Sequence, residues 1–168
     1  MNEDLKSFVG NEYEYYAAKW QKFELAEKGI TSLNIYALFF SLAWIAYRKF
    51  TPAVFVYAFL TSILLVVQNL IKLFYPESND VQDILKYYLP IIPGIILGLY
   101  GNYWYYLYSQ KQIIKLKKKY PVGEILKEKL EKNGNPSIIF LFINVGLFFV
   151  LSMLMLGFWE LLFQLFFD

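Results

Sequence analysis

Residues 87–119 read YYLPIIPGIILGLYGNYWYYLYSQKQIIKLKKK, an apolar run that ends in a cluster of lysines. The part from Leu89 to Leu107 contains no charged residue. About twenty residues of α-helix cross the ~30 Å hydrocarbon core of a bilayer, and lysines at one end of such a helix favour the cytoplasmic side. The stretch therefore predicts a transmembrane helix over residues 87–108 with its basic end in the cytoplasm.

Small residues recur on one face of this predicted helix. Gly94, Gly98 and Gly101 are spaced by four and three residues, and Asn102 lies beside them. Because glycine has no Cβ, a second helix can approach this face closely. We expect it to pack against the helix Pro52–Leu73 or against a second protomer. The intrachain partner is favoured, because a three-helix protein needs one close internal contact to fold.

The composition agrees with a membrane protein. Of the 168 residues, 58% are hydrophobic and 21% aromatic, and the mean hydropathy is +0.38, which fits a small integral membrane protein better than a soluble domain. The chain has no cysteine and no histidine. This excludes disulfides, thiol chemistry, zinc sites of the Cys/His kind and histidine-ligated haem. We expect no metal and no cofactor.

Three further apolar segments complete the predicted fold. Residues 52–73 and 138–159 are full spans, whereas the uncharged part of residues 33–47 reaches only ~22 Å as a helix. Such a segment is a short or tilted span, or a re-entrant or interfacial element. The predicted fold class is all-α: a small polytopic helical membrane protein with three full transmembrane helices plus one short re-entrant, interfacial or fourth spanning helix.

The predicted domain organisation has two parts. Residues 1–31 form an N-terminal amphipathic helix, with its helical part over Asn11–Lys28, where Tyr, Trp and Phe side chains recur every three or four residues. Residues 32–168 form the membrane domain. Its basic cytoplasmic loop, residues 109–136, includes a second short amphipathic helix over Val122–Lys132.

Loop charges predict the topology. The segment Lys111–Lys132 carries eight lysines, whereas the loop Tyr75–Asp83 carries only acidic charges. By the positive-inside rule the basic loop is cytoplasmic, and the acidic loop and the C-terminus are external. The N-terminus lies outside if residues 33–47 span the bilayer and inside if they do not. The shortness of that segment and the lack of an export-signal pattern favour inside.

The sequence shows candidate binding residues but no catalytic constellation. No aspartate lies within a span and no histidine is present as a base, so we expect no enzyme. Five lysines are candidates to bind anionic lipid headgroups first and a protein second: Lys111, Lys115, Lys117, Lys118 and Lys119. No aromatic residues interleave them, so no nucleic acid is expected.

Two function hypotheses remain from the residues alone. The leading one is a non-catalytic membrane module, an accessory, scaffold or immunity/defence-type protein that acts through helix packing and its basic cytoplasmic face. Its partners would be the bilayer, a second copy of the chain, or another membrane or cytoplasmic protein. The rival is a small homo-oligomeric channel or transport component. It takes Asn102 and Asn144 as lining a polar pathway rather than joining helices by amide hydrogen bonds.

Three blocks of sequence resemble the YigF-like family of small bacterial inner-membrane proteins, a family whose domain has no known function. The blocks lie in Asn11–Phe23, Ser32–Lys49 and Gly98–Lys111, so the resemblance covers most of residues 11–119. Leu33 stands where the family usually has tryptophan, and Ser41 where it has glycine. The resemblance implies a membrane location and a helical architecture, and it brings no established activity.

Overall fold

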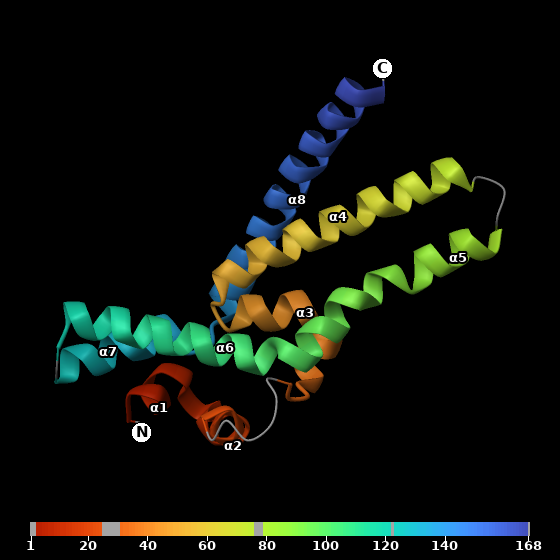
Figure 1. Cartoon of the computed structure of the whole chain (residues 1–168). Helices are drawn as coiled ribbons and strands as arrows, with labels where there is room; N and C mark the ends of the chain where they lie inside the picture. Colours follow the sequence, from red (N-terminus) through yellow and green to blue (C-terminus); the bar gives the residue numbers. More distant parts are fainter. Residues whose placement is uncertain (1–2, 25–30, 76–78, 122, 168) are drawn as a thin grey trace.

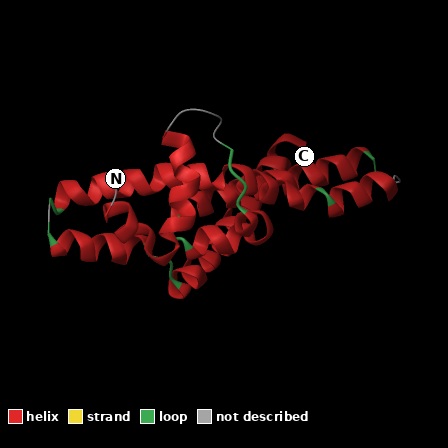
Figure 2. Ribbon diagram, turned by 90° about the horizontal axis from the view of Figure 1, so that it is seen from below, coloured by secondary structure: helices red, strands yellow, loops and turns green. Residues whose placement is uncertain are grey.

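The computed structural model describes residues 3–24, 31–75, 79–121 and 123–167, and these residues form helices and turns with no strand (Figure 2). The α-helices are α1 Glu3–Val9, α2 Tyr13–Glu24, α3 Ile35–Tyr47, α4 Thr51–Phe74, α5 Asn79–Tyr87, α6 Ile92–Lys119, α7 Glu124–Gly134 and α8 Ile138–Phe167. Two short 3₁₀ helices, η1 Gly10–Glu12 and η2 Leu89–Ile91, precede α2 and α6. The predicted all-helical class is confirmed for this part of the chain.

Three segments are long and apolar enough to cross a membrane: Thr51–Phe74, Asp83–Lys119 and Ile138–Leu165. Figure 1 shows α4, α5 and α8 extending away from α1, α2 and α7. In an apolar 18-residue stretch of each segment, the share that is buried inside the protein is only 17%, 33% and 6%, respectively. A continuous apolar surface of this size is unfavourable in water, so it is the surface that hydrocarbon would cover. The expectation of three such helices is confirmed.

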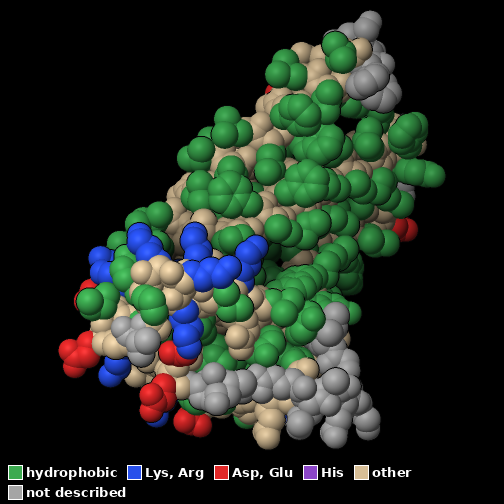
Figure 3. Space-filling view, turned by 60° about the vertical axis from the view of Figure 1, so that its left-hand side comes forward, with side chains coloured by type: hydrophobic (Ala, Val, Ile, Leu, Met, Phe, Trp, Pro, Cys, Tyr) green, Lys and Arg blue, Asp and Glu red, His purple; other side chains and the backbone are tan. Residues whose placement is uncertain are grey.

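Charged side chains gather at the opposite end of the molecule. Figure 3 shows Lys, Arg, Asp and Glu side chains at its lower left, while hydrophobic side chains dominate the rest of this face. The charged end is formed by α1, α2, α7 and the C-terminal half of α6 (Figure 1). Phe8 of α1, Ile113 of α6 and Leu130 of α7 are buried there, and they belong to the same hydrophobic core as residues of α3 and α4.

The central segment is not the single helix over 87–108 that the sequence predicts. A 3₁₀ turn containing Pro90 separates α5 from α6, because proline removes a backbone donor and disfavours the helical conformation of the preceding residue. Beyond residue 108, α6 continues to Lys119. Residues 109–119 of this helix were predicted as part of a loop. They remain helical because Ile113 and Leu116 pack inward, and the helix ends where Pro121 follows.

The N-terminal region also differs from the prediction. Helix begins at Glu3, and α1 is a separate helix that the sequence reading missed. Gly10 then adopts a left-handed conformation with φ of 77°, which suits glycine because it has no Cβ. The chain re-enters a helix as α2 at Tyr13 and is described to Glu24. The predicted end of the helix at Lys28 lies outside the described residues.

The short helix α3 lies between α6, α4 and α8 (Figure 1). Its 13 residues correspond to ~20 Å at 1.5 Å per residue, and Phe40 departs from helical geometry with φ of −115° and ψ of 23°. The C-terminal end of α3 meets α2, because the indole of Trp44 donates to the Tyr16 hydroxyl at 3.2 Å. The length agrees with the prediction that this segment is too short to cross a bilayer upright.

Candidate functional site

The glycine face of α6 packs against α3. A Cβ added at Gly94 would lie 2.7 Å from the carbonyl oxygen of Leu38, and one at Gly98 would lie 2.9 Å from the Leu38 Cβ. At Gly101 the nearest group is the Trp44 ring, at 3.4 Å. The glycine face is therefore buried against another helix of the same chain, as predicted, but that helix is α3 and the expected Pro52–Leu73 helix is wrong. The short helix fits here because only a glycine face admits a backbone at this distance.

Two main-chain hydrogen bonds strengthen this contact. The Ser32 amide donates to the Leu99 carbonyl at 2.8 Å, and the Asn34 amide donates to the Gly98 carbonyl at 2.7 Å. Backbone groups in an apolar environment are costly to leave unpaired. The segment that leads into α3 therefore pairs its own amide groups with carbonyls of α6.

Asn102 lies at the centre of a buried hydrogen-bond network. Its side-chain oxygen accepts from the side-chain amide of Asn34 at 2.8 Å, and its side-chain nitrogen donates to the Ser32 hydroxyl at 3.2 Å. Its main-chain oxygen accepts from the Trp20 indole at 3.0 Å. Asn34 also caps α3, because its side-chain oxygen accepts from the Ala37 amide at 2.9 Å. Asn102 thus joins α2, the start of α3 and α6.

Arg48 is the most buried charged side chain among the described residues, with 1% of its surface exposed. One of its terminal nitrogens forms an ion pair with Glu12, which is half-exposed. Its guanidinium lies 4.7 Å from the ring centroid of Tyr16 and 5.7 Å from that of Tyr105, within the range of cation–π attraction. Its Nε and Nη1 atoms and the Tyr105 hydroxyl have no hydrogen-bond partner within the described residues.

We call this set of side chains the polar junction: Glu12, Tyr16, Trp20, Asn34, Arg48 and Asn102. Burial raises the pKa of Tyr16 well above 10, with the neighbouring Tyr105 adding to the effect. Burial also lowers the pKa of Arg48 from its ordinary value. At neutral pH the junction therefore holds a neutral phenol beside a guanidinium cation.

Of the residues in the polar junction, only Asn102 was predicted from the sequence, as a packing residue beside the glycines of α6. The pairing of Arg48 with Glu12 joins residues 36 apart in the chain, which no local periodicity reveals. The available signal was an arginine directly after an apolar segment that also contains Trp44, because such a cation needs a nearby partner.

Asn144 is in a different part of the molecule. It is 1% exposed, and its side-chain nitrogen donates to the carbonyl of Phe140 in its own helix at 2.9 Å and to that of Ala46 in α3 at 3.4 Å. It therefore joins α8 to α3, whereas Asn102 joins α6 to α2 and α3. The structure does not bring the two asparagines together.

The five candidate lysines do not form a single patch. Lys111, Lys115 and Lys118 are exposed along one face of α6 at spacings of four and three residues. Lys117 instead pairs with Asp4 of α1 at 2.7 Å, and Lys119 lies 5.4 Å from the Tyr120 ring centroid. Within the described residues, no three His, Cys, Asp or Glu side chains come close enough to hold a metal ion.

These features define the class of protein: a small all-helical chain with three apolar helices of membrane-spanning length and a charged layer of shorter helices at one end. The family described as "Protein of unknown function (DUF2628)" matches residues 9–111, and the chain belongs to this family. No curated protein and no solved structure matched the chain. The prediction of an uncharacterised family is confirmed, while the YigF-like name stays a prediction.

The family match has a structural meaning. It begins at the end of α1, contains every residue of the polar junction, and ends at Lys111 within α6. Helices α7 and α8 lie outside it. The part of the fold that defines the family is therefore the unit of α2, α3, α4, α5 and the apolar half of α6.

Proposed function

We propose that this chain is an integral protein of the bacterial inner membrane that acts without catalysis, as an accessory, scaffold or immunity-type module. The observation that carries the proposal is the polar junction. Hydrogen bonds from Trp20 to Asn102 and from Trp44 to Tyr16, and the ion pair of Arg48 with Glu12, fix α2 to α3 and α6. Charged helices held rigidly on membrane helices are a ready surface for a partner.

The contact between α1 and α7 supports a cytoplasmic N-terminus. A Cβ at Gly134 would overlap the Phe8 carbonyl oxygen, so the two helices touch and would share one side of the membrane. Between them lie two long apolar segments, Thr51–Phe74 and Asp83–Lys119. Two crossings return the chain to its starting side, so α3 makes no third crossing. With α7 cytoplasmic by its lysines, the N-terminus is cytoplasmic and the C-terminus external.

In-cell crosslinking tests the scaffold proposal. A photoreactive residue placed at Glu14 of α2 or Lys127 of α7, both exposed, should give a discrete protein adduct of constant mass. The same residue at Met153 of α8, which is 74% exposed on the apolar surface, should not give that adduct. If neither charged-end position gives an adduct while the protein conducts ions, the scaffold proposal is wrong.

The second candidate is a small homo-oligomeric channel or transport component. The positions of Asn102 and Asn144 in the structure give this candidate less support than the scaffold. Asn102 and Asn144 each form hydrogen bonds within one protomer and lie in separate helix contacts, which argues against one polar pathway lined by both. We expect ion flux through reconstituted liposomes to equal that of empty vesicles. A flux that is abolished by Asn102→Leu would favour the channel.

A further inference from the structure

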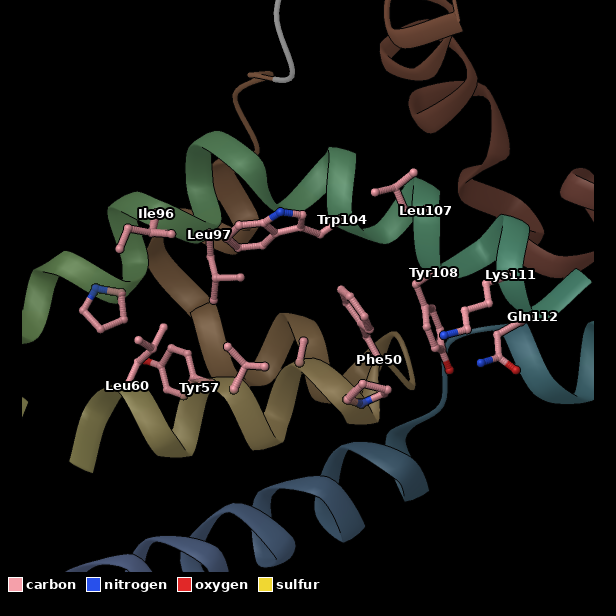
Figure 4. A pocket seen from close by; sticks show the side chains of 14 residues that line it. Phe50, Tyr57, Leu60, Ile96, Leu97, Trp104, Leu107, Tyr108, Lys111 and Gln112 are labelled. Carbon is pink, nitrogen blue, oxygen red and sulfur yellow. The ribbon is translucent and has the colours of Figure 1, made fainter. Parts of the chain in front are cut away.

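An apolar groove runs between α4 and α6 (Figure 4). Its volume is about 440 Å³, within the ~300–1,000 Å³ of small-molecule sites. Leu60 of α4 and Ile96 of α6 line one end, and Tyr108, Lys111 and Gln112 line the other. The groove therefore changes from apolar to basic along its length.

The basic end lies at the level where the apolar helices begin. The ring of Phe50, the residue before α4, packs on that of Tyr108 of α6 in a tilted arrangement with centroids 4.6 Å apart. Tyr108 also donates to the main-chain oxygen of Lys49 at 2.9 Å. Because Lys111 lines the groove beside these residues, its ammonium group lies at the headgroup level of the membrane that α4 would enter.

The positive charge at this end comes from Lys111. Within the described residues, Lys111 makes no ion pair, in contrast to Lys117, which binds Asp4. Lys115 and Lys118 continue the exposed face of α6 beyond Lys111. The site thus attracts an anion joined to an apolar chain.

We propose that this groove binds one acidic glycerophospholipid, with an acyl chain between α4 and α6 and its phosphate at Lys111. The proposal rests on the membrane placement proposed above. It goes beyond general attraction to headgroups, because it assigns one lipid to one groove and makes Trp104, which lines the groove and is 36% exposed, its neighbour.

Tryptophan quenching by lipids with brominated acyl chains tests the site. The protein is reconstituted in phosphatidylcholine containing a small fraction of brominated lipid, either phosphatidylglycerol or phosphatidylcholine. The difference in quenching between wild type and Trp104→Phe isolates the contribution of Trp104. We expect brominated phosphatidylglycerol to quench Trp104 more strongly, with an apparent preference of roughly fivefold, the effect of about one basic residue.

Two pairs of variants locate the effect. Lys111→Gln should abolish the preference, whereas Lys127→Gln, which removes the same charge from α7, should keep it. Val56→Trp should block the groove, because Val56 lines it, whereas Phe55→Trp changes a neighbouring exposed residue that does not. For these two variants, binding is counted by native mass spectrometry of the phosphatidylglycerol retained.

Three results would overturn the assignment. Equal quenching by both lipids would mean that the groove takes any surrounding lipid. A preference that survives Lys111→Gln and bound lipid that survives Val56→Trp would place the lipid elsewhere. A dimer that Val56→Trp dissociates would make a second copy of the chain the occupant. Each result leaves the crosslinking test of the scaffold proposal unaffected, so the two proposals fail separately.

Discussion

Arg48 and Glu12 form an ion pair in which the two residues have very different surroundings. Arg48 is 1% exposed, while Glu12 is 46% exposed. A buried charge that loses its partner is costly, whereas an exposed carboxylate that loses its partner is solvated by water. The two ends of this pair should therefore respond differently to mutation.

We expect Glu12→Ala to lower the free energy of unfolding in detergent by about 1.5–3 kcal/mol, because it leaves the Arg48 cation without its acceptor. Arg48→Met should cost less, about 1 kcal/mol or under, since a buried ion pair is often replaced by an apolar side chain at little cost. Chemical denaturation of both variants measures the difference. Arg48→Met being the more damaging change would show that the cation–π contacts with Tyr16 and Tyr105 dominate.

Tyr16 gives the polar junction a response to alkaline pH. Burial raises its pKa in the folded protein above the value of 10 in the unfolded chain. Its stabilising effect is therefore fully present below pH 10 and is lost as the pH rises through the folded pKa, because the unfolded chain then ionises first. Melting temperatures of wild type and Tyr16→Phe should converge above pH 10.

Below pH 10, Tyr16→Phe should melt at a lower temperature, because the Trp44 indole loses its acceptor. Tyr88→Phe, which removes an exposed hydroxyl, controls for the loss of one tyrosine. A gap between wild type and Tyr16→Phe that stays constant at all pH values would contradict the titration of Tyr16.

At the scale of helices, the sequence predicts what depends on local pattern. Hydropathy and length identify 52–73 and 138–159 as long apolar helices. The first agrees with α4 within one residue at each end, whereas α8 begins at the predicted residue but continues to Phe167. The same rule identifies residues 33–47 as too short. Local pattern does not say which helix faces the glycines, because Leu38 and Gly98 are 60 residues apart and only the tertiary packing brings them together. The Arg48–Glu12 pair escapes sequence reading for the same reason.

Helix α1 could have been predicted from the sequence. Leu5, Phe8 and Val9 follow the spacing of an amphipathic helix and are all buried. The predicted N-terminal helix instead began at Asn11. The continuation of α6 through its lysines was also readable, because Ile113 and Leu116 keep the helical period.

The packing of α3 on the glycine face predicts a clear mutational contrast. Gly98→Leu should lower the free energy of unfolding by about 1–3 kcal/mol or more, because even a Cβ at this position would meet Leu38 at 2.9 Å. Gly146→Leu is the matched control, since a Cβ at Gly146 of α8 meets nothing within 4 Å. Thermal unfolding in detergent and size-exclusion chromatography measure stability and oligomeric state.

Because the partner of the glycine face belongs to the same chain, the same variant also has an expected effect on the oligomeric state. Gly98→Leu should leave the oligomeric state unchanged, because its face is occupied by α3 of the same chain. Equal melting temperatures for Gly98→Leu and Gly146→Leu would show that α3 does not pack there. A change of oligomer alone would instead place a second protomer on the glycines.

For the whole molecule, the contact between α1 and α7 links the topology of both ends of the chain. Phe8 packs on Gly134, so α1 and α7 must lie on one side whatever the orientation. The loop charges indicate which side of the membrane this is, because the eight lysines of Lys111–Lys132 favour the cytoplasm. An orientation experiment therefore tests the fold and the charge rule together.

Single cysteines in this cysteine-free chain provide the measurement. Asp80→Cys, at an exposed position in the first turn of α5, should react with a membrane-impermeant maleimide in intact cells. Glu14→Cys in α2 and Lys127→Cys in α7 should react only after the membrane is permeabilised. Reaction of Lys127→Cys but not Asp80→Cys in intact cells would invert the charge rule while keeping the fold. Opposite accessibility of Glu14→Cys and Lys127→Cys would contradict the α1–α7 contact, and α3 would then have to cross the membrane.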